Sequence, residues 1–198
     1  MKNIFKILGL FSIVVLAACA QPELPKDHYY RLQIHAPEKV KGAALFKGTI
    51  EVQRFVADGL TAGRPIVYSD VGSEHKLLEY HYHFWTEPPI VMLRDQLIDY
   101  MRAANAAEMI VSPEMRARPD YRLTGKIKRL EKVVGPNPSA IAELELGLQN
   151  EKNGEIVNLA NYRVEVGAQS QSVSDAVIAM NKALTEIYSR FVASLRKL

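Results

Sequence analysis

Residues 76–104 read KLLEYHYHFWTEPPIVMLRDQLIDYMRAA, and the hydrophobic period changes in the middle of this stretch. Apolar and polar side chains alternate up to residue 85, which is typical of a half-buried β-strand. After that point apolar residues recur at spacings of three and four, which predicts an amphipathic helix that ends near Asn105. We expect Thr86 to cap this helix, with Pro88 and Pro89 in its first turn, where amide donors have no partner.

The alternating stretch presents two different faces. One face is apolar or aromatic throughout and carries Leu78, Tyr80, Tyr82 and Phe84. The other face is mixed and carries Glu79, His81, His83 and Trp85. We expect the more apolar face to meet the core, because one face of a half-buried strand must do so. Trp85 would then be exposed at the strand end, where it is the best candidate for a partner contact. The alternative is that Trp85 packs under the helix that follows.

Alternation predicts further strands on both sides of this stretch, at residues 29–34, 49–56, 65–69, 121–134, 140–148 and 156–166. In the second of these, Val56 is expected on the inward face. The alternation slips at Arg129-Leu130, which predicts a β-bulge. Residues 150–154 are polar and form the expected hairpin loop between the last two strands. Residues 108–115 are interpreted as an extended connection.

A second helix is predicted after Ser172, a preferred N-cap residue, with Asp175 placed to complete part of a capping box. Its apolar stripe consists of Val173, Val177, Met180, Leu184, Ile187, Phe191 and Leu195. The chain is therefore expected to form a single α/β domain, with α+β as the alternative. A mixed sheet of about five or more strands would pack against two main helices.

The N-terminus carries a targeting signal. Lys2 and Lys6 precede an apolar run over residues 7–15, which is too short to span a membrane and fits a secretory signal peptide. The run closes with Leu-Ala-Ala-Cys at residues 16–19, which resembles the lipobox of bacterial lipoproteins. That resemblance implies cleavage before Cys19 and attachment of acyl chains, palmitate among them, to this residue. The alternative is an ordinary secretory signal followed by an incidental cysteine.

The predicted organisation is a signal peptide (1–18), a lipidated tether (19–28) and one domain (29–198). The absence of Asp after the lipidated position resembles the outer-membrane address of enteric lipoproteins. Removal of the signal leaves 198 − 18 = 180 residues and lowers the net charge from +3 to +1, because two lysines leave with it. Such a nearly neutral chain argues against nucleic acid as a partner.

The sequence contains no recognisable catalytic or phosphate-binding motif. His81 and His83 would share a strand face, but a zinc site needs further ligands, and the only cysteine is predicted to be acylated. Glu143 and Glu145 alternate with leucines, as solvent-facing residues of a strand do. We therefore predict no metal, no cofactor and no enzymatic activity. A periplasmic hydrolase assembled from distant residues is the least favoured alternative.

Several short segments, taken in order, resemble the ABC-type transport auxiliary lipoproteins, the PqiC-like family. Beside the lipobox they are Tyr29–Leu32, Gly48–Val52, Asp58–Leu60, Pro65–Tyr68 and the segment Tyr82–Leu93 with Trp85, Pro88 and Leu93. The resemblance covers essentially the whole mature chain, and its weight comes from the order and spacing of the segments.

This resemblance implies a lipid-anchored periplasmic protein of the outer membrane. Its partners would be an ABC transporter, with permease and ATPase, and a subunit with a mammalian-cell-entry (MCE) domain. Such systems move phospholipids or other hydrophobic molecules between membranes. A homo-oligomer is left open. The alternative from another class is an assembly or structural lipoprotein of a different envelope complex.

The lipobox generates a first prediction. Cys19→Ala removes the thiol that accepts the lipid, so this variant should be neither acylated nor cut by the lipoprotein peptidase. Intact-mass spectrometry of the wild-type protein from membranes should show loss of residues 1–18 and added acyl mass. An unmodified Cys19 in the mature native protein would contradict the prediction.

Overall fold

The structure is a computed structural model that describes residues 25–73 and 75–198. The predicted signal peptide, Cys19 and the first residues of the tether lie outside the described residues. The described part forms one domain with a curled, mixed, nine-stranded sheet and two α-helices. The predicted α/β fold with a mixed sheet and two main helices is confirmed.

The long strand β7 (Tyr121–Val134) is the centre of the sheet. One of its edges pairs antiparallel with β8 (Ser139–Asn150), which in turn pairs antiparallel with β9 (Ile156–Gly167). The other edge is shared, in succession, by three parallel strands: β2 (Phe46–Val52), β3 (Val56–Ala57) and β4 (Pro65–Asp70). A single strand thus joins both halves of the sheet.

Each half of the sheet is extended at its outer side. Strand β6 (Ala107–Val111) pairs parallel with β2. Strand β5 (Leu77–Trp85) pairs antiparallel with β4, and β1 (His28–Tyr30) pairs parallel with β5. Short 3₁₀ turns, η2 (Gly59–Ala62) and η3 (Pro113–Met115), follow β3 and β6.

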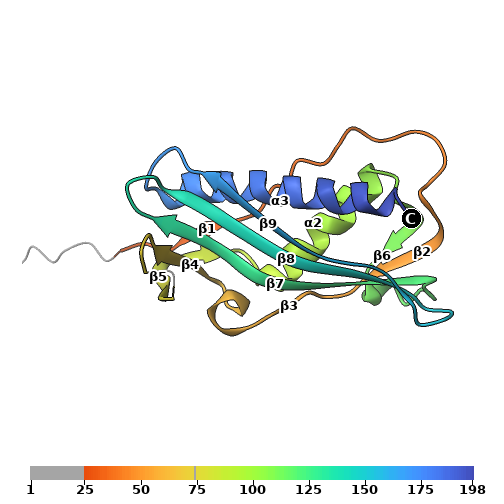
Figure 1. Cartoon of the computed structure of the whole chain (residues 1–198). Coiled ribbons are helices and arrows are strands. Elements are labelled where there is room, and N and C mark those ends of the chain that lie inside the picture. Colours follow the sequence, from red (N-terminus) through yellow and green to blue (C-terminus); the bar gives the residue numbers. More distant parts are fainter. Residues whose placement is uncertain (1–24, 74) are drawn as a thin grey trace, which may run out of the picture.

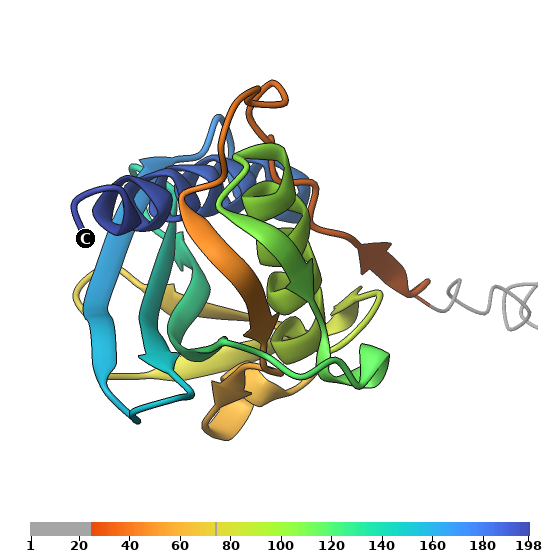
Figure 2. The same cartoon turned by 90° about the vertical axis from the view of Figure 1, so that its right-hand side faces the viewer.

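Two helices fill the concave side of the sheet (Figures 1 and 2). Helix α3 (Val173–Leu195) lies along β8 and β9, and helix α2 (Pro89–Ala103) packs beside β6. The entire predicted stripe of α3 is buried, opposite the inward side chains of β8, which are Ala140, Ala142, Leu144, Leu146 and Leu148. Small residues on the strand let the helix approach closely, and the leucines fill the remaining space.

Several local predictions are confirmed. Strand β7 shows a register shift between Ile127 and Arg129, as expected for the bulge. Residues 150–154 connect β8 and β9 as predicted. The Ser172 hydroxyl accepts the Asp175 N–H at 3.0 Å, which is the expected N-cap. The Asp175 carboxylate accepts a hydrogen bond from Ser170, so only one half of a capping box forms.

Several local predictions are wrong. The strand predicted at residues 29–34 is only β1, which ends at Tyr30, and residues 31–34 form no strand. Residues 108–115, predicted as a connection, contain most of strand β6 and the turn η3. Val56 is 58% exposed, because the ring of Phe55 takes the inward place above Gly125. Thr86 does not cap α2: the N-cap is Pro88, in extended backbone. A residue before a proline is disfavoured in helical conformation, so Pro89 forces the helix to begin at itself.

The predicted exposure of Trp85 is also wrong, because its side chain is only 1% exposed. Pro65 of β4 pairs with Phe84 of β5, and Val67 pairs with Glu79. Between these two pairs β4 advances by two residues and β5 by five, so the register shifts. A bulge of this kind reverses which residues face the core. Tyr80 therefore packs against the core before the shift, and Trp85 enters the core after it, whereas Tyr82 is 44% exposed.

Trp85→Ala should therefore destabilise the fold. Truncation of a large buried aromatic typically costs about 3–5 kcal/mol of unfolding free energy. Tyr82→Ala is the matched control, since it removes an exposed aromatic from the same strand and should change stability by less than about 1 kcal/mol. Chemical denaturation of both variants measures the difference. Equal stability of Trp85→Ala and the wild type would show that this burial is not needed.

Candidate functional site

The described chain begins at Pro25, at the left end of the molecule in Figure 1. Strand β1, the β4–β5 connection and the turn between β7 and β8 lie at this end, whereas β2, β6 and the C-terminus lie at the other. We call the first of these the tether end, because the predicted tether leaves the domain there. It is the candidate functional site, because an anchor at the predicted position would act on the domain through this end.

The chain enters the fold by pairing β1 with the last residues of β5. His28, Tyr29 and Tyr30 lie beside His83, Phe84 and Trp85, respectively. The Thr86 N–H donates to the Tyr30 carbonyl at 2.8 Å, and the following Leu32 is buried in the core. The first described residues are thus fixed both by backbone pairing and by an apolar anchor.

Beyond Leu32 the backbone is held by side chains instead of a strand. The N–H of Gln33 donates to Asn181 Oδ1 at 2.9 Å, and the N–H of His35 donates to Thr185 Oγ1 at 3.2 Å. Between them, the N–H of Ile34 donates to Oε1 of Gln96 at 2.9 Å. Successive N–H groups of an extended chain point to opposite sides, so they reach α3, α2 and α3 in turn.

The three acceptors, Gln96, Asn181 and Thr185, form what we call the helix clamp. The bonds from Gln33 and His35 are exposed and the bond from Ile34 is half-buried, so each contributes about 0.5–1.5 kcal/mol by fixing the course of the chain. The Thr185 hydroxyl also donates to the Asn181 carbonyl at 2.8 Å. This bond orients the lone pairs of the Thr185 oxygen toward the N–H of His35. The segment that follows the tether is therefore built into the helical layer.

An open groove of about 640 Å³ lies beside the clamp, between residues 33–37 and the outer face of α3. Its lining includes Tyr100 and Ile178, together with the polar side chains of Lys182, Glu186 and Ser189. The exposed area of its lining is mostly apolar, which fits a contact surface.

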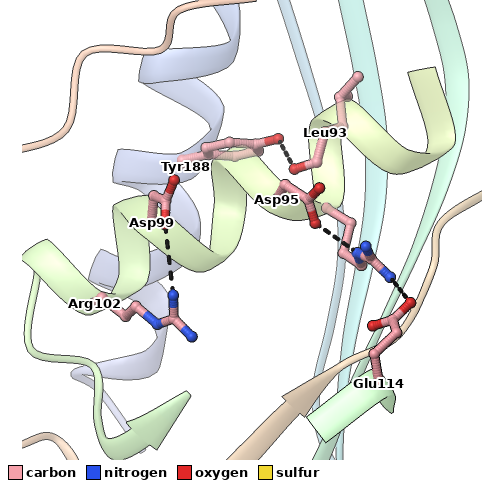
Figure 3. Close-up of polar contacts among 7 residues, drawn as sticks. Leu93, Asp95, Asp99, Arg102, Glu114 and Tyr188 are labelled. Atoms are coloured by element: carbon pink, nitrogen blue, oxygen red, sulfur yellow. Dashed lines mark hydrogen bonds and ion pairs between the residues drawn. The ribbon is translucent and has the colours of Figure 1, made fainter. Parts of the chain in front are cut away.

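Two tyrosines join α2 to α3, and Figure 3 shows one of them, Tyr188. The buried Tyr188 of α3 donates its hydroxyl to the Leu93 carbonyl of α2 at 2.8 Å. The Tyr100 ring meets the Tyr188 ring edge-on at 5.8 Å. Burial raises the pKa of Tyr188 well above its usual value, so the hydroxyl keeps its proton and remains a donor. The clamp consequently rests on two helices that are themselves bonded to each other.

A buried guanidinium ties α2 to the turn after β6 (Figure 3). Arg94, which is 6% exposed, contacts Asp95 and Glu114 at 2.8 Å each. A hydrogen bond from the Ser112 side chain and another from Arg94 lower the pKa of Glu114 to about 2. Burial acts to lower the pKa of Arg94, but its two acidic partners outweigh this effect and raise it. The ion pair thus stays intact across the physiological range and is structural.

Polar and aromatic groups gather under β5 at the tether end. Lys132 is only 2% exposed, and its Nζ donates to the Tyr80 hydroxyl at 3.0 Å and to the Gln171 carbonyl. The Tyr30 hydroxyl and His83 Nδ1 are 2.8 Å apart. Burial, followed by the positive charges of His28 and Lys132, lowers the pKa of His83. His83 is therefore held as a neutral imidazole between β1 and β5.

The structure separates the two histidines that were predicted to share a face. His81 is exposed, whereas the bulge turns His83 inward to Tyr30. Within residues 25–73 and 75–198, no group of three or more His, Cys, Asp or Glu side chains is arranged to hold a metal ion. Trp85 is a core residue and offers no surface to a partner, while Cys19 lies outside the described residues.

The clamp residues were missed by sequence reasoning. Asn181 and Thr185 lie on the outer side of a predicted amphipathic helix, where polar residues are ordinary, and Gln96 has the same character. Lys132 could have been found, because it falls on the core-facing side of β7 once the bulge near Arg129 is taken into account. None of the described helices is both long and apolar enough to cross a membrane.

Residues 30–191 match the family model described as "ABC-type transport auxiliary lipoprotein component". The chain belongs to this family. The matched range begins in β1 and ends in α3, so it contains the clamp, the groove and all nine strands except the first residues of β1. No curated protein matches the chain.

Solved structures show the same fold. Protein XCC0632 from Xanthomonas campestris, described as a DUF330 family member, is 18% identical with a TM-score of 0.72, over 83% of this chain and 92% of that one. A structure described only as an uncharacterized protein gives 13% identity and a TM-score of 0.64, over 86% and 99%. The hypothetical protein CT253 from Chlamydia trachomatis gives 9% and 0.52, over 77% and 99%. At these identities the likeness concerns the fold alone.

The lowered pKa of His83 predicts a pH effect. Because its folded-state pKa lies below the ordinary 6.5, the stability from the neutral imidazole is fully present above pH 6.5. That stability is lost as the pH falls through the folded-state pKa. NMR titration should place the His83 midpoint below 6.5, and His28→Gln, which removes a nearby positive charge, should raise it. A midpoint at or above 6.5 in the wild type would contradict this account.

Proposed function

We propose that this protein is a non-catalytic, outer-membrane-anchored component of an ABC transport system with an MCE-domain subunit. Its lipid anchor would hold the domain at the periplasmic face, where it helps the transporter engage the outer membrane. The cargo of such a system would be phospholipid or another hydrophobic compound. The observation that carries this proposal is the family match over residues 30–191, together with the lipobox that precedes it.

The construction of the tether end supports an anchoring role. A domain that links a membrane to a protein complex has to resist displacement of its first residues. Here those residues are paired with β5, buried at Leu32 and bonded to both helices by the clamp. His28 lies nine positions after Cys19, so an extended tether would reach about 30 Å at 3.3 Å per residue.

The bonding of the buried cations supports a non-catalytic role. Arg94 is neutralised by two carboxylates, and Lys132 is bonded to a hydroxyl and a carbonyl in the packed interior. Both cations are thus engaged by protein partners. A non-catalytic role also agrees with the description of the family as a transport auxiliary component.

Capture from native membranes tests the proposal. The lipidated wild-type protein, tagged at Leu198, should fractionate with the outer membrane and retrieve an MCE-domain subunit with its permease and ATPase. Cys19→Ala is the matched control, because it leaves the described domain unchanged and removes the acyl chains, while the uncut signal peptide stays attached. It should retrieve less, since anchoring confines both partners to one surface and raises their effective concentration.

Two results would contradict the proposal. Retrieval of a different envelope complex by the lipidated protein would favour an assembly or structural lipoprotein. Fractionation with the inner membrane, with no transporter subunit retrieved, would exclude the proposed location and partner together.

A further inference from the structure

The outer side of β1 and β5 carries exposed apolar and aromatic side chains from the β4–β5 connection to the place where the chain enters the domain, with the exposed Glu79 and His81 between them. Tyr29 is 57% exposed and Tyr82 is 44% exposed. Leu77, at the start of β5, is 42% exposed, and Val71, in the β4–β5 connection, is 60% exposed. We call these four residues the tether-end patch.

The patch has an ordered centre. The Tyr29 ring lies 5.8 Å from the Phe84 ring, and the Arg64 guanidinium lies 5.6 Å from the Tyr29 ring centroid. Tyr82 and Phe84 are two positions apart, so they share the outer face of the strand. The same reversal of facing that buries Trp85 therefore presents Tyr82 outward.

From this arrangement we propose that the tether-end patch rests on the headgroup region of the lipid bilayer. The inference rests on the anchoring part of the proposed function. Tyrosine suits this layer, because its ring enters the apolar boundary while its hydroxyl stays hydrated. Leu77 and Val71 add aliphatic surface, and Arg64 adds a cation that pairs with lipid phosphates.

The length of the tether selects the membrane as the occupant. Tyr29 is ten residues from Cys19, so the lipid anchor confines the patch to within about 35 Å of the bilayer at 3.3–3.6 Å per residue. Within that distance a contact too weak to bind membranes alone becomes populated, because the tether supplies a high effective concentration. The tether does not hold exposed residues at the opposite end of the domain, such as Met109 on β6, close to the bilayer.

The contact would set the orientation of the domain. With the tether-end patch on the bilayer, β2, β6 and the C-terminus at the opposite end of the molecule face the periplasm (Figure 1). The helix clamp then lies between the membrane contact and the surfaces available to a transporter. Anchor and patch together restrict tumbling, which the anchor alone does not.

Quenching by brominated lipids tests the inference on the lipidated full-length protein. Tyr82→Trp places a reporter in the patch, and Met109→Trp, at a residue 53% exposed on β6, is the matched control. Leu77→Trp is a second patch reporter in case the first variant folds poorly. The proteins are reconstituted into vesicles of phosphatidylethanolamine and phosphatidylglycerol with brominated acyl chains, and the emission of Trp85 in the wild type is subtracted.

Emission from residues 82 and 77 should be lost on brominated vesicles, whereas emission from residue 109 should be retained. Equal emission at the patch and at the control, in protein shown by flotation to be vesicle-bound, would overturn the inference. The same result is expected if the patch binds a protein instead of lipid, because these vesicles contain no partner protein. Failure of every variant to float with vesicles would instead contradict the lipid anchor on which the proposed function rests.

Discussion

The backbone of residues 33–35 depends on three side-chain acceptors that belong to two different helices. Without Gln96, Asn181 and Thr185, the N–H groups of this segment would have only water as a partner, because the segment has no strand to join. The constraint also works in the other direction. Because one chain segment is bonded to both α2 and α3, it joins the two helices at the surface, as the Tyr188–Leu93 bond joins them in the interior. The region next to the tether is thus continuous with the core.

Long periodic elements could be predicted from the sequence because their signals are repeated many times. The stripe of α3 and the alternation of β7, β8 and β9 each extend over several turns or residue pairs, so one exception does not hide the pattern. Strand β6 could not be found in this way. It has only five residues, and its pairing with β2 is decided by neighbours far away in the chain.

The tether end was predicted poorly for a different reason. Its decisive contacts are long-range and polar: Gln33 and Asn181 are 148 positions apart. No local pattern encodes such a bond, and Asn and Thr on an outer helix face have an ordinary appearance. The burial of Trp85 could not be predicted for the same reason. The register shift between β4 and β5 exchanges the inward and outward residues of β5, and it depends on the pairing of the two strands. The strand was predictable, whereas the facing of its second half depended on a partner strand.

Native-state hydrogen exchange tests most directly whether the clamped segment belongs to the core. The amides of Gln33, Ile34 and His35 should exchange only through the large openings that also expose amides in the middle of β8, such as Leu144. Their exchange should therefore merge with that of β8 as denaturant is added. Exchange at the rate of the β8–β9 loop, without dependence on denaturant, would show that these residues open locally and that the clamp does not fix the tether to the fold.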